Sequence, residues 1–252
     1  MKPRRRTVVI DCFPEAGRKY KRGYAVVAVD VIRATTSATT LAALGHRCYP
    51  VGSLEAAFAL AELLPNPLLV GELAGALPGG FHLQNSPADL TRLGNSCRPI
   101  VLLSTSGTKL IEESRRADAV YLGCFRNFTA TAEHIAGRHR KIAVIGAGSR
   151  GEFREEDQMG CARIAEQLVE AGYEAGDAAT TAVIERWRGV PFRACETGKS
   201  AEYLRRTGQS RDLDFVLSHI DDIPAAFLMS EGKVVQAAER AETLLKGATT
   251  AS

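Results

Sequence analysis

Acidic side chains stand where they could share a cation. They follow short apolar runs or a glycine-rich stretch, and they are Asp30, Glu72, Glu156 and Asp157. Magnesium prefers carboxylate and water oxygens, and it commonly joins one or two protein carboxylates to a substrate phosphate. We therefore predict Mg²⁺ as a cofactor, with these four residues as its candidate ligands.

Basic residues lie in or beside the same stretches, namely Arg33, Lys109, Arg126, Arg150 and Arg154. A site that holds both signs of charge suits a multiply anionic substrate bridged by a cation. We expect Asp30, Arg33 and Glu72 to act in catalysis, with Arg33 stabilising charge on a transferring phosphoryl group. The attacking group stays open between water and a carboxylate. Asp30 lacks the second aspartate of aspartyl-phosphate enzymes, since Ile32 stands two residues later.

Glycine, amide and hydroxyl residues also gather in these stretches. At the start of a helix such residues expose backbone N–H groups that suit anions. The candidates for substrate binding are Thr35, Asn85, Ser86, Thr105, Gly107, Thr108, Asn127, Gly148 and Arg150.

The elements that must position these residues alternate between two patterns. Short runs rich in Val, Ile and Leu predict buried strands at 8–10, 25–31, 68–70, 100–103, 119–122 and 142–145. Longer patterns with helical spacing lie at 36–44, 53–64, 108–116 and 127–138, with Ser53 and Asn127 as candidate N-caps. Such alternation indicates a largely parallel sheet that binds ligands at the carboxyl ends of its strands.

The pattern changes after Asp157. Residues 159–171 and 178–187 both have helical spacing, with no clear strand between them. We predict a three-layer α/β/α fold with a helix-rich C-terminal part. No linker or repeat divides the chain, so we expect a single domain over 1–252, with the alternation in 1–157 and the helices in 158–252.

Residues 146–151 match the G-x-G-x-x-G string of dinucleotide-binding folds. That fold needs a second strand after the helix, ending in an acidic residue about 20 positions on, and we see no such strand. Carboxylates at Glu152, Glu155, Glu156 and Asp157 would also repel a pyrophosphate. We expect no dinucleotide cofactor.

Cys12 and Arg18 have the C-x5-R spacing of cysteine-dependent phosphatases. Glu15 would face the bound phosphate, and no apolar helix follows whose N-terminus could lower the thiol pKa. We expect no catalytic cysteine.

Composition excludes several partners. Lys and Arg total 32 against 29 Asp and Glu, a net charge of +3 that is too small to indicate nucleic acid. The six cysteines are scattered without zinc-site spacing. No apolar stretch resembles a signal peptide or spans a bilayer, so we expect a cytoplasmic protein with no membrane partner. The oligomeric state stays open, with a homodimer as one candidate.

An ordered set of motifs over about residues 25 to 165 resembles the 2-phosphosulfolactate phosphatase family. It comprises Asp30-Val31-Ile32-Arg33-Ala34-Thr35, Gly71-Glu72, Asn85-Ser86-Pro87, the loop from Ser104 to Thr108, Asn127, and Ala147-Gly148 with Gly151, Phe153, Glu156 and Asp157. The resemblance implies Mg²⁺-dependent hydrolysis of (2R)-2-phospho-3-sulfolactate to 3-sulfolactate and phosphate, as in coenzyme M biosynthesis. That substrate carries phosphate, sulfonate and carboxylate on three carbons.

The chain departs from the family pattern at five positions. Leu73 replaces an Arg, His82 and Gln84 replace Asp and Gly, Ser106 replaces Asn, and Gly146 replaces Cys. Losing an Arg removes an anion clamp, so the resemblance supports the reaction type more strongly than the identity of the substrate. Two alternatives stay open: a metal-dependent phosphatase acting on another small phosphorylated acid, and a small-anion binding protein without catalysis.

Overall fold

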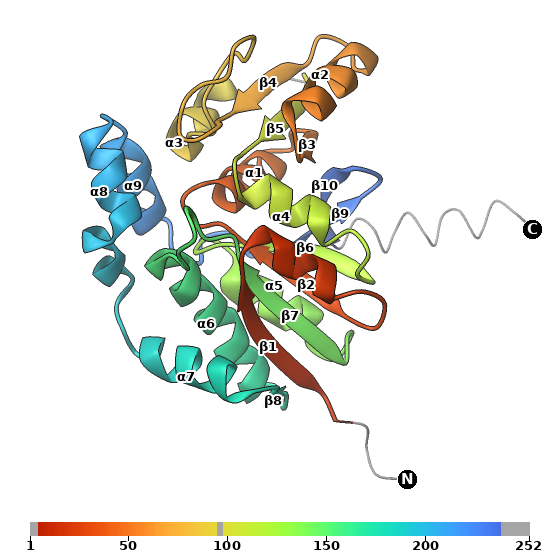
Figure 1. The fold of residues 1–252 in the computed structure, drawn as a ribbon, viewed down its shortest axis with the longest axis vertical. Coiled ribbons are helices and arrows are strands. Elements are labelled where there is room, and N and C mark those ends of the chain that lie inside the picture. The colour runs from red at the N-terminus through yellow and green to blue at the C-terminus, as the bar shows by residue number, and fades with distance from the viewer. Residues whose placement is uncertain (1–4, 95–97, 238–252) are drawn as a thin grey trace, which may run out of the picture.

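Two β-sheets form the framework of the molecule (Figure 1). A computed structural model describes residues 5–94 and 98–237. The larger sheet has seven strands in the order β10-β9-β6-β2-β7-β1-β8, and the smaller has three in the order β3-β5-β4. Every strand pair is parallel except those that β9 makes with β6 and with β10.

The larger sheet consists of seven strands. They are β1 (Thr7–Cys12), β2 (Ala25–Val29), β6 (Ala119–Gly123), β7 (Lys141–Gly146), β8 (Glu174–Ala175), β9 (Phe227–Ser230) and β10 (Lys233–Gln236). β2 is wholly buried and reads AVVAV. A strand covered on both faces needs such a continuous apolar run, which is why the sequence predicts it clearly.

The smaller sheet consists of β3 (Cys48–Val51), β4 (Leu68–Gly71) and β5 (Ile100–Leu103). Its register aligns β4 and β5 so that Gly71 lies opposite Leu103. The loops that follow these two strands therefore leave the sheet side by side.

Helices separate and cover the two sheets. α1 (Ala34–Ala43) and α4 (Gly107–Glu113) lie between the sheets, while α5 (Phe128–Ile135), α6 (Glu155–Glu170) and α7 (Ala178–Trp187) cover the far face of the larger one (Figure 1). The expected α/β/α layering is confirmed around the larger sheet. One buried apolar cluster includes Val26 and Leu122 of the larger sheet and Val70 and Leu102 of the smaller, so the two share a core.

The remaining elements are α2 (Leu54–Leu63), α3 (Pro87–Leu90), α8 (Lys199–Arg206), α9 (Ser210–Ser218) and the 3₁₀ turns η1 (Pro14–Lys19), η2 (Thr91–Leu93) and η3 (Phe192–Thr197). Ser53 caps α2 as predicted, since its side chain accepts from the Ala56 amide at 3.2 Å. Asn127 occupies the N-cap position of α5 without capping it. Its side chain turns back to accept from the Cys124 amide at 3.0 Å.

The prediction missed four strands, namely β3, β8, β9 and β10. β8 has two residues and no apolar run; it forms only because Glu174 and Ala175 pair with β1. β9 and β10 form a hairpin through Glu231 and Gly232, both with positive φ. The helix-rich C-terminal part therefore also completes both edges of the larger sheet.

Two further expectations concern single features of the chain. Five cysteines are free thiols, as expected, and Cys97 lies outside the described residues. Within residues 5–94 and 98–237, no helix has the length and apolar character needed to cross a bilayer.

Candidate active site

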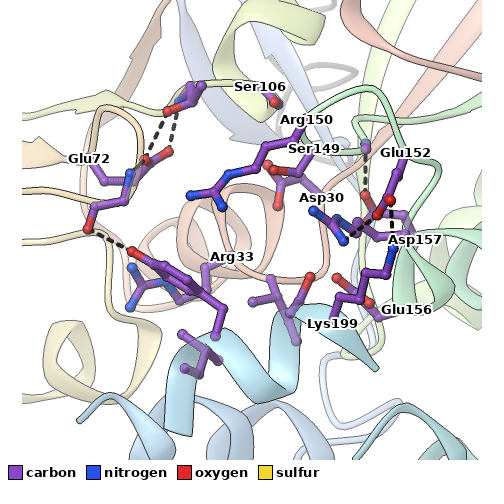
Figure 2. A pocket seen from close by; sticks show the side chains of 18 of the residues that line it. Asp30, Arg33, Glu72, Ser106, Ser149, Arg150, Glu152, Glu156, Asp157 and Lys199 are labelled. Carbon is purple, nitrogen blue, oxygen red and sulfur yellow. Dashed lines mark hydrogen bonds and ion pairs between the residues drawn. The ribbon is translucent and has the colours of Figure 1, made fainter. Parts of the chain in front are cut away.

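A pocket of about 590 Å³ opens where the carboxyl ends of both sheets meet. Its walls come from the loops after β2, β4, β5 and β7, from the first turn of α6, from residue 85, and from helix α8 (Figure 2). The predicted convergence of strand-end loops is thus present, although the strands belong to two sheets. The loop after β6, expected to join them, does not line the pocket.

Asp30 lies in the pocket wall at the end of β2. Its Oδ1 accepts from the Ala34 amide at 3.2 Å, and its Oδ2 packs against Gly107, where an added Cβ would lie 2.2 Å away. Burial raises the pKa of Asp30 to about 7; the Ala34 hydrogen bond opposes this shift, and the carboxylates of Glu72 and Glu156 add to it. An unneutralised carboxylate is therefore costly at this position.

Glu156 and Asp157 lie in the first turn of α6 and are both buried. Burial raises the pKa of Glu156, which Ser200 of α8 partly opposes by hydrogen bonding. Asp157 accepts from the Val31 amide at 2.8 Å and from the Gly148 amide at 3.0 Å. It thereby ties the loop after β2 to the turn after β7, and burial together with Asp30 and Glu156 raises its pKa.

Glu72 organises the two loops of the smaller sheet. Its Oε1 accepts from the Thr105 amide at 2.7 Å, and its Oε2 accepts from the Thr105 hydroxyl at 2.8 Å and the Gly75 amide at 2.7 Å. The Thr105 hydroxyl also accepts from the Ala74 amide at 2.7 Å. Both oxygens of Glu72 are thus engaged by the protein.

The four predicted metal ligands are not gathered into one cluster. Across the described residues, no group of three or more Asp, Glu, His or Cys side chains is arranged to hold a metal ion. Asp30 and Glu156 nevertheless both face the pocket, and the like charge of Glu156 adds to the cost of ionising Asp30 (Figure 2). Asn85 adds a buried Oδ1 at the pocket wall with no hydrogen-bond partner in the described part of the chain. These oxygen donors fit a magnesium ion that takes its other ligands from water and substrate.

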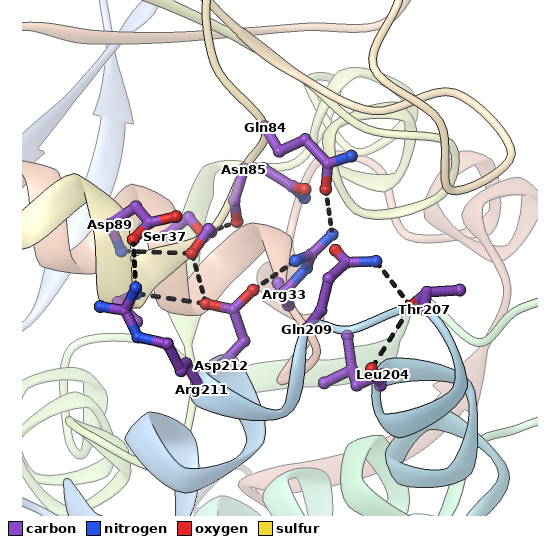
Figure 3. A network of polar contacts seen from close by, with 12 residues as sticks. Arg33, Ser37, Gln84, Asn85, Asp89, Leu204, Thr207, Gln209, Arg211 and Asp212 are labelled. Atoms are coloured by element: carbon purple, nitrogen blue, oxygen red, sulfur yellow. Dashed lines mark hydrogen bonds and ion pairs between the residues drawn. The ribbon is translucent and has the colours of Figure 1, made fainter.

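Arg33 lines the pocket, and its guanidinium contacts two residues outside the lining. Its Nη1 donates to Asp212 of α9, and its Nη2 reaches Gln84 Oε1 at 3.5 Å (Figure 3). Asp212 also accepts from the Ser86 hydroxyl and, at 3.3 Å, from the Ala88 amide. The C-terminal helices therefore fix the predicted catalytic arginine.

The predicted substrate-binding residues divide into two groups. Those that line the pocket are Asn85, Thr105, Gly148 and Arg150. The others lie outside the lining and are Thr35, Ser86, Gly107, Thr108 and Asn127.

Residues of the second group support the loops through hydrogen bonds to the backbone. The Thr35 hydroxyl donates to Gly123 O at 2.8 Å, and the Thr108 hydroxyl accepts from the Ser104 amide at 2.8 Å. Short polar side chains bond local backbone in this way as readily as they bind ligands, so the sequence does not separate the two uses.

Helix α8 supplies pocket residues that the sequence pattern does not predict. Its contribution is Lys199, Ser200, Glu202, Tyr203, Leu204 and Arg206. Asp212 of α9 was missed as well. Both helices read as ordinary amphipathic segments, and their alternation of charged and apolar residues carried no chemical signal.

The expectation that no strand follows the helix after the glycine-rich turn is wrong, because a strand does follow α6. That strand, β8, ends two residues before Asp177. β1 lies between β7 and β8, however, and Asp177 caps α7 by accepting from the Thr180 amide at 2.7 Å. At the start of α6 the Gly148 amide already donates to Asp157. The prediction of no dinucleotide therefore rests on these contacts and not on a missing strand.

Cys12 does not have the lowered pKa of an activated thiol. Burial, and then the neighbouring Asp11, raise its pKa above the ordinary value, and Arg18 pairs with Glu113. A catalytic cysteine requires the opposite shift.

The positions that depart from the family pattern have different surroundings. His82 is exposed and accepts from the Leu69 amide at 2.9 Å through Nδ1, which ties its loop to β4. A side chain at Gly146 would meet the Phe153 ring at 2.3 Å. Ser106 lines the pocket, Gln84 contacts Arg33, and Leu73 packs against the apolar cluster of the smaller sheet.

Comparison with known proteins decides the family. The model of the family described as 2-phosphosulpholactate phosphatase matches residues 12–229. The chain belongs to this family. A protein of Carboxydothermus hydrogenoformans named "Probable 2-phosphosulfolactate phosphatase" is 32% identical over 215 residues, which cover 84% of this chain and 89% of that protein.

Two further relatives in the family carry the same name. The one from Deinococcus radiodurans is 32% identical over 216 residues, covering 79% of this chain and 90% of its own. The one from Symbiobacterium thermophilum is 30% identical over 220 residues, covering 84% and 94%. The region that the family model matches, residues 12–229, includes every residue that lines the pocket.

Proposed function

We propose that the chain is a Mg²⁺-dependent phosphatase that hydrolyses (2R)-2-phospho-3-sulfolactate to 3-sulfolactate and phosphate. The observation that carries this proposal is the pocket of a family member in which buried Asp30 and Glu156 face the basic side chains Arg33 and Arg150. A phosphate ester with further anionic groups matches both signs of charge.

Asp30 and Glu156 are the residues that would hold the metal, with the Asn85 Oδ1 as a neutral donor beside them. When bound, Mg²⁺ would neutralise phosphate oxygens and offset charge that develops as the ester breaks. Asp157 then has a supporting part, since its two backbone hydrogen bonds hold the loops that carry Asp30 and Gly148.

Arg33 would stabilise charge on the phosphoryl group. Asp212 takes one side of its guanidinium, and the pairing fixes the side chain before substrate arrives. Such preorganised charge costs no reorganisation during the reaction. In the net reaction a water oxygen bonds to phosphorus, the bond from phosphorus to the substrate oxygen breaks, and that oxygen takes a proton.

The nucleophile is either water or the Asp30 carboxylate. The stereochemical course at phosphorus separates these routes. With a substrate whose phosphate is made chiral by oxygen isotopes, direct attack by water inverts the configuration, whereas attack by Asp30 followed by attack of water at the same phosphorus retains it.

The proposal includes a small anionic substrate as the partner, a cytoplasmic location, no nucleic-acid or membrane partner, and a homodimer as the assembly to test by sedimentation. Two other functions remain to be separated from it. Phosphate release across a Mg²⁺ series distinguishes an enzyme from an anion binder, and a panel of phosphorylated hydroxy acids distinguishes this substrate from another small phosphorylated acid.

A further inference from the structure

Arg150 differs in its partners from Arg33, Arg154 and Lys199, which also line the pocket. Arg33 pairs with Asp212, while Arg154 and Lys199 both pair with Glu152. Within residues 5–94 and 98–237, Arg150 has no carboxylate partner, and its guanidinium extends into the middle of the pocket (Figure 2). Its N–H donors are therefore open to a ligand.

The ring of Tyr203 supports Arg150 from α8. The Arg150 Cζ lies 5.8 Å from the centre of that ring. An aromatic ring attracts the face of a guanidinium and leaves the N–H donors at its edge free. The contact thus orients the cation without using its donors.

Tyr203 is itself fixed by the loop after β4. Its hydroxyl donates to Gly75 O at 3.2 Å, and an added Cβ at Gly75 would lie 1.9 Å from that hydroxyl. Gly75 has φ of 88°, so a larger residue would be excluded by both backbone and space. The amide of Gly75 also donates to Glu72, which connects this support to the pocket wall.

The backbone at Arg150 is unusual for a non-glycine residue. Its φ is 52°, in a tight turn closed by two hydrogen bonds between Ser149 and Glu152 of 2.9 and 3.0 Å. A left-handed conformation of this kind costs energy and is kept where the surrounding structure requires it. The same turn includes Gly148, which donates to Asp157, so the position of Arg150 is coupled to the acidic end of the pocket.

We propose that Arg150, supported by Tyr203, is the specificity-determining residue that binds an anionic group on the carbon chain of the substrate, apart from its phosphate. This inference rests on the proposed function and deepens it. The phosphate is directed to Asp30 and Glu156 with the metal, and the sulfonate or carboxylate to the free guanidinium. Enzymes distinguish related substrates by such differences in binding.

Binding of the product tests the assignment without requiring catalysis. The Kd values of 3-sulfolactate and of inorganic phosphate are measured calorimetrically, with Mg²⁺ present, for the wild type and for Arg150→Met. We expect 3-sulfolactate to bind at least tenfold more weakly to the variant and phosphate to change less than threefold. Lactate and isethionate, which carry the carboxylate and the sulfonate alone, identify which group Arg150 binds.

Four variants complete the design. Arg206→Met is the matched control, because it removes one exposed positive charge from the same pocket. Arg150→Lys should restore part of the affinity, and Tyr203→Leu should weaken 3-sulfolactate binding while Tyr203→Phe retains most of it. Equal losses for Arg150→Met and Arg206→Met, or an unchanged Kd for 3-sulfolactate in Arg150→Met, would overturn the assignment.

The proposed function can fail separately. If the wild type binds 3-sulfolactate through Arg150 but releases no phosphate from the phosphorylated acid, the specificity assignment stands and the catalytic proposal fails. If the wild type releases phosphate from that acid, and Arg150→Met has wild-type KM values both on the acid and on a simple phosphate monoester, the catalytic proposal stands and the specificity assignment fails.

Discussion

Arg33 and Asp212 form a buried ion pair that joins the loop after β2 to helix α9, 179 positions later in the chain. Their side chains are 4% and 3% exposed. Because Asp212 also accepts from Ser86 and Ala88, one carboxylate holds three segments together. The C-terminal helices are therefore part of the site and not an appendage to the sheet.

Asp212→Asn should destabilise the protein and slow the reaction. Removing one partner of a buried pair leaves an uncompensated charge, which costs about 3 kcal/mol, or a melting temperature lower by roughly 10 °C in a chain of this size. We expect kcat to fall at least tenfold, measured by phosphate release. Asp214→Asn, an exposed change on the same helix, is the control.

The double variant Arg33→Met with Asp212→Leu separates the two effects. Apolar residues of similar volume often replace a buried pair without loss of stability. Thermal stability should recover relative to Asp212→Asn while activity stays low. Recovery of both would mean that Arg33 has no part in the reaction.

Asp30→Asn should cost about a hundredfold or more in kcat, on the scale of lost metal-ion catalysis, and should raise the Mg²⁺ requirement. Folding should survive, since the change removes a buried charge whose burial is unfavourable. Phosphate release across a Mg²⁺ series and thermal unfolding measure the two properties. A lowered melting temperature with near-normal turnover would instead indicate a structural aspartate.

Glu72→Gln should act through the loops. The carboxylate accepts three hydrogen bonds, and an amide nitrogen turned toward those donors would break at least one of them. We expect a lower kcat with an unchanged Mg²⁺ requirement, and a similar defect in Thr105→Val, which lacks the hydroxyl donor. A raised Mg²⁺ requirement in Glu72→Gln alone would instead indicate that Glu72 is a metal ligand, as the sequence predicts.

The metal-free protein should lose stability as the pH rises. Asp30 has its pKa raised from an ordinary value of 3.8 to about 7, so between these values the folded state binds more protons than the unfolded state. The stability is present in full below pH 4 for this group and is lost as the pH passes 7. Melting temperatures in EDTA should fall from pH 5 to pH 8, less steeply in Asp30→Asn, and added Mg²⁺ should oppose the fall.

The sequence predicted those features whose cause is local. β2 and β7 are recognisable because strands buried on both faces must be apolar throughout. Asp30 and Arg150 are recognisable because they follow such strands. β8 could not be predicted, because two residues pair with β1 only through the tertiary arrangement.

The same reason limits the prediction of the site. Thr35 and Thr108 have the residue types of anion ligands, yet their hydroxyls bond the backbone of their own loops. Asp212 and Tyr203 reach the site from helices whose sequence gives no sign of it. Which polar groups remain free for a ligand is decided by packing between segments distant in the chain.

Phosphate release from (2R)-2-phospho-3-sulfolactate, with and without Mg²⁺, tests the central claim most directly. The purified protein is stripped of metal with EDTA, supplied with the substrate, and assayed across a Mg²⁺ series beside Asp30→Asn. We predict saturable release that depends on Mg²⁺, that EDTA abolishes, and that Asp30→Asn reduces about a hundredfold or more. No release at any Mg²⁺ concentration, or equal release in EDTA, would contradict the proposed function.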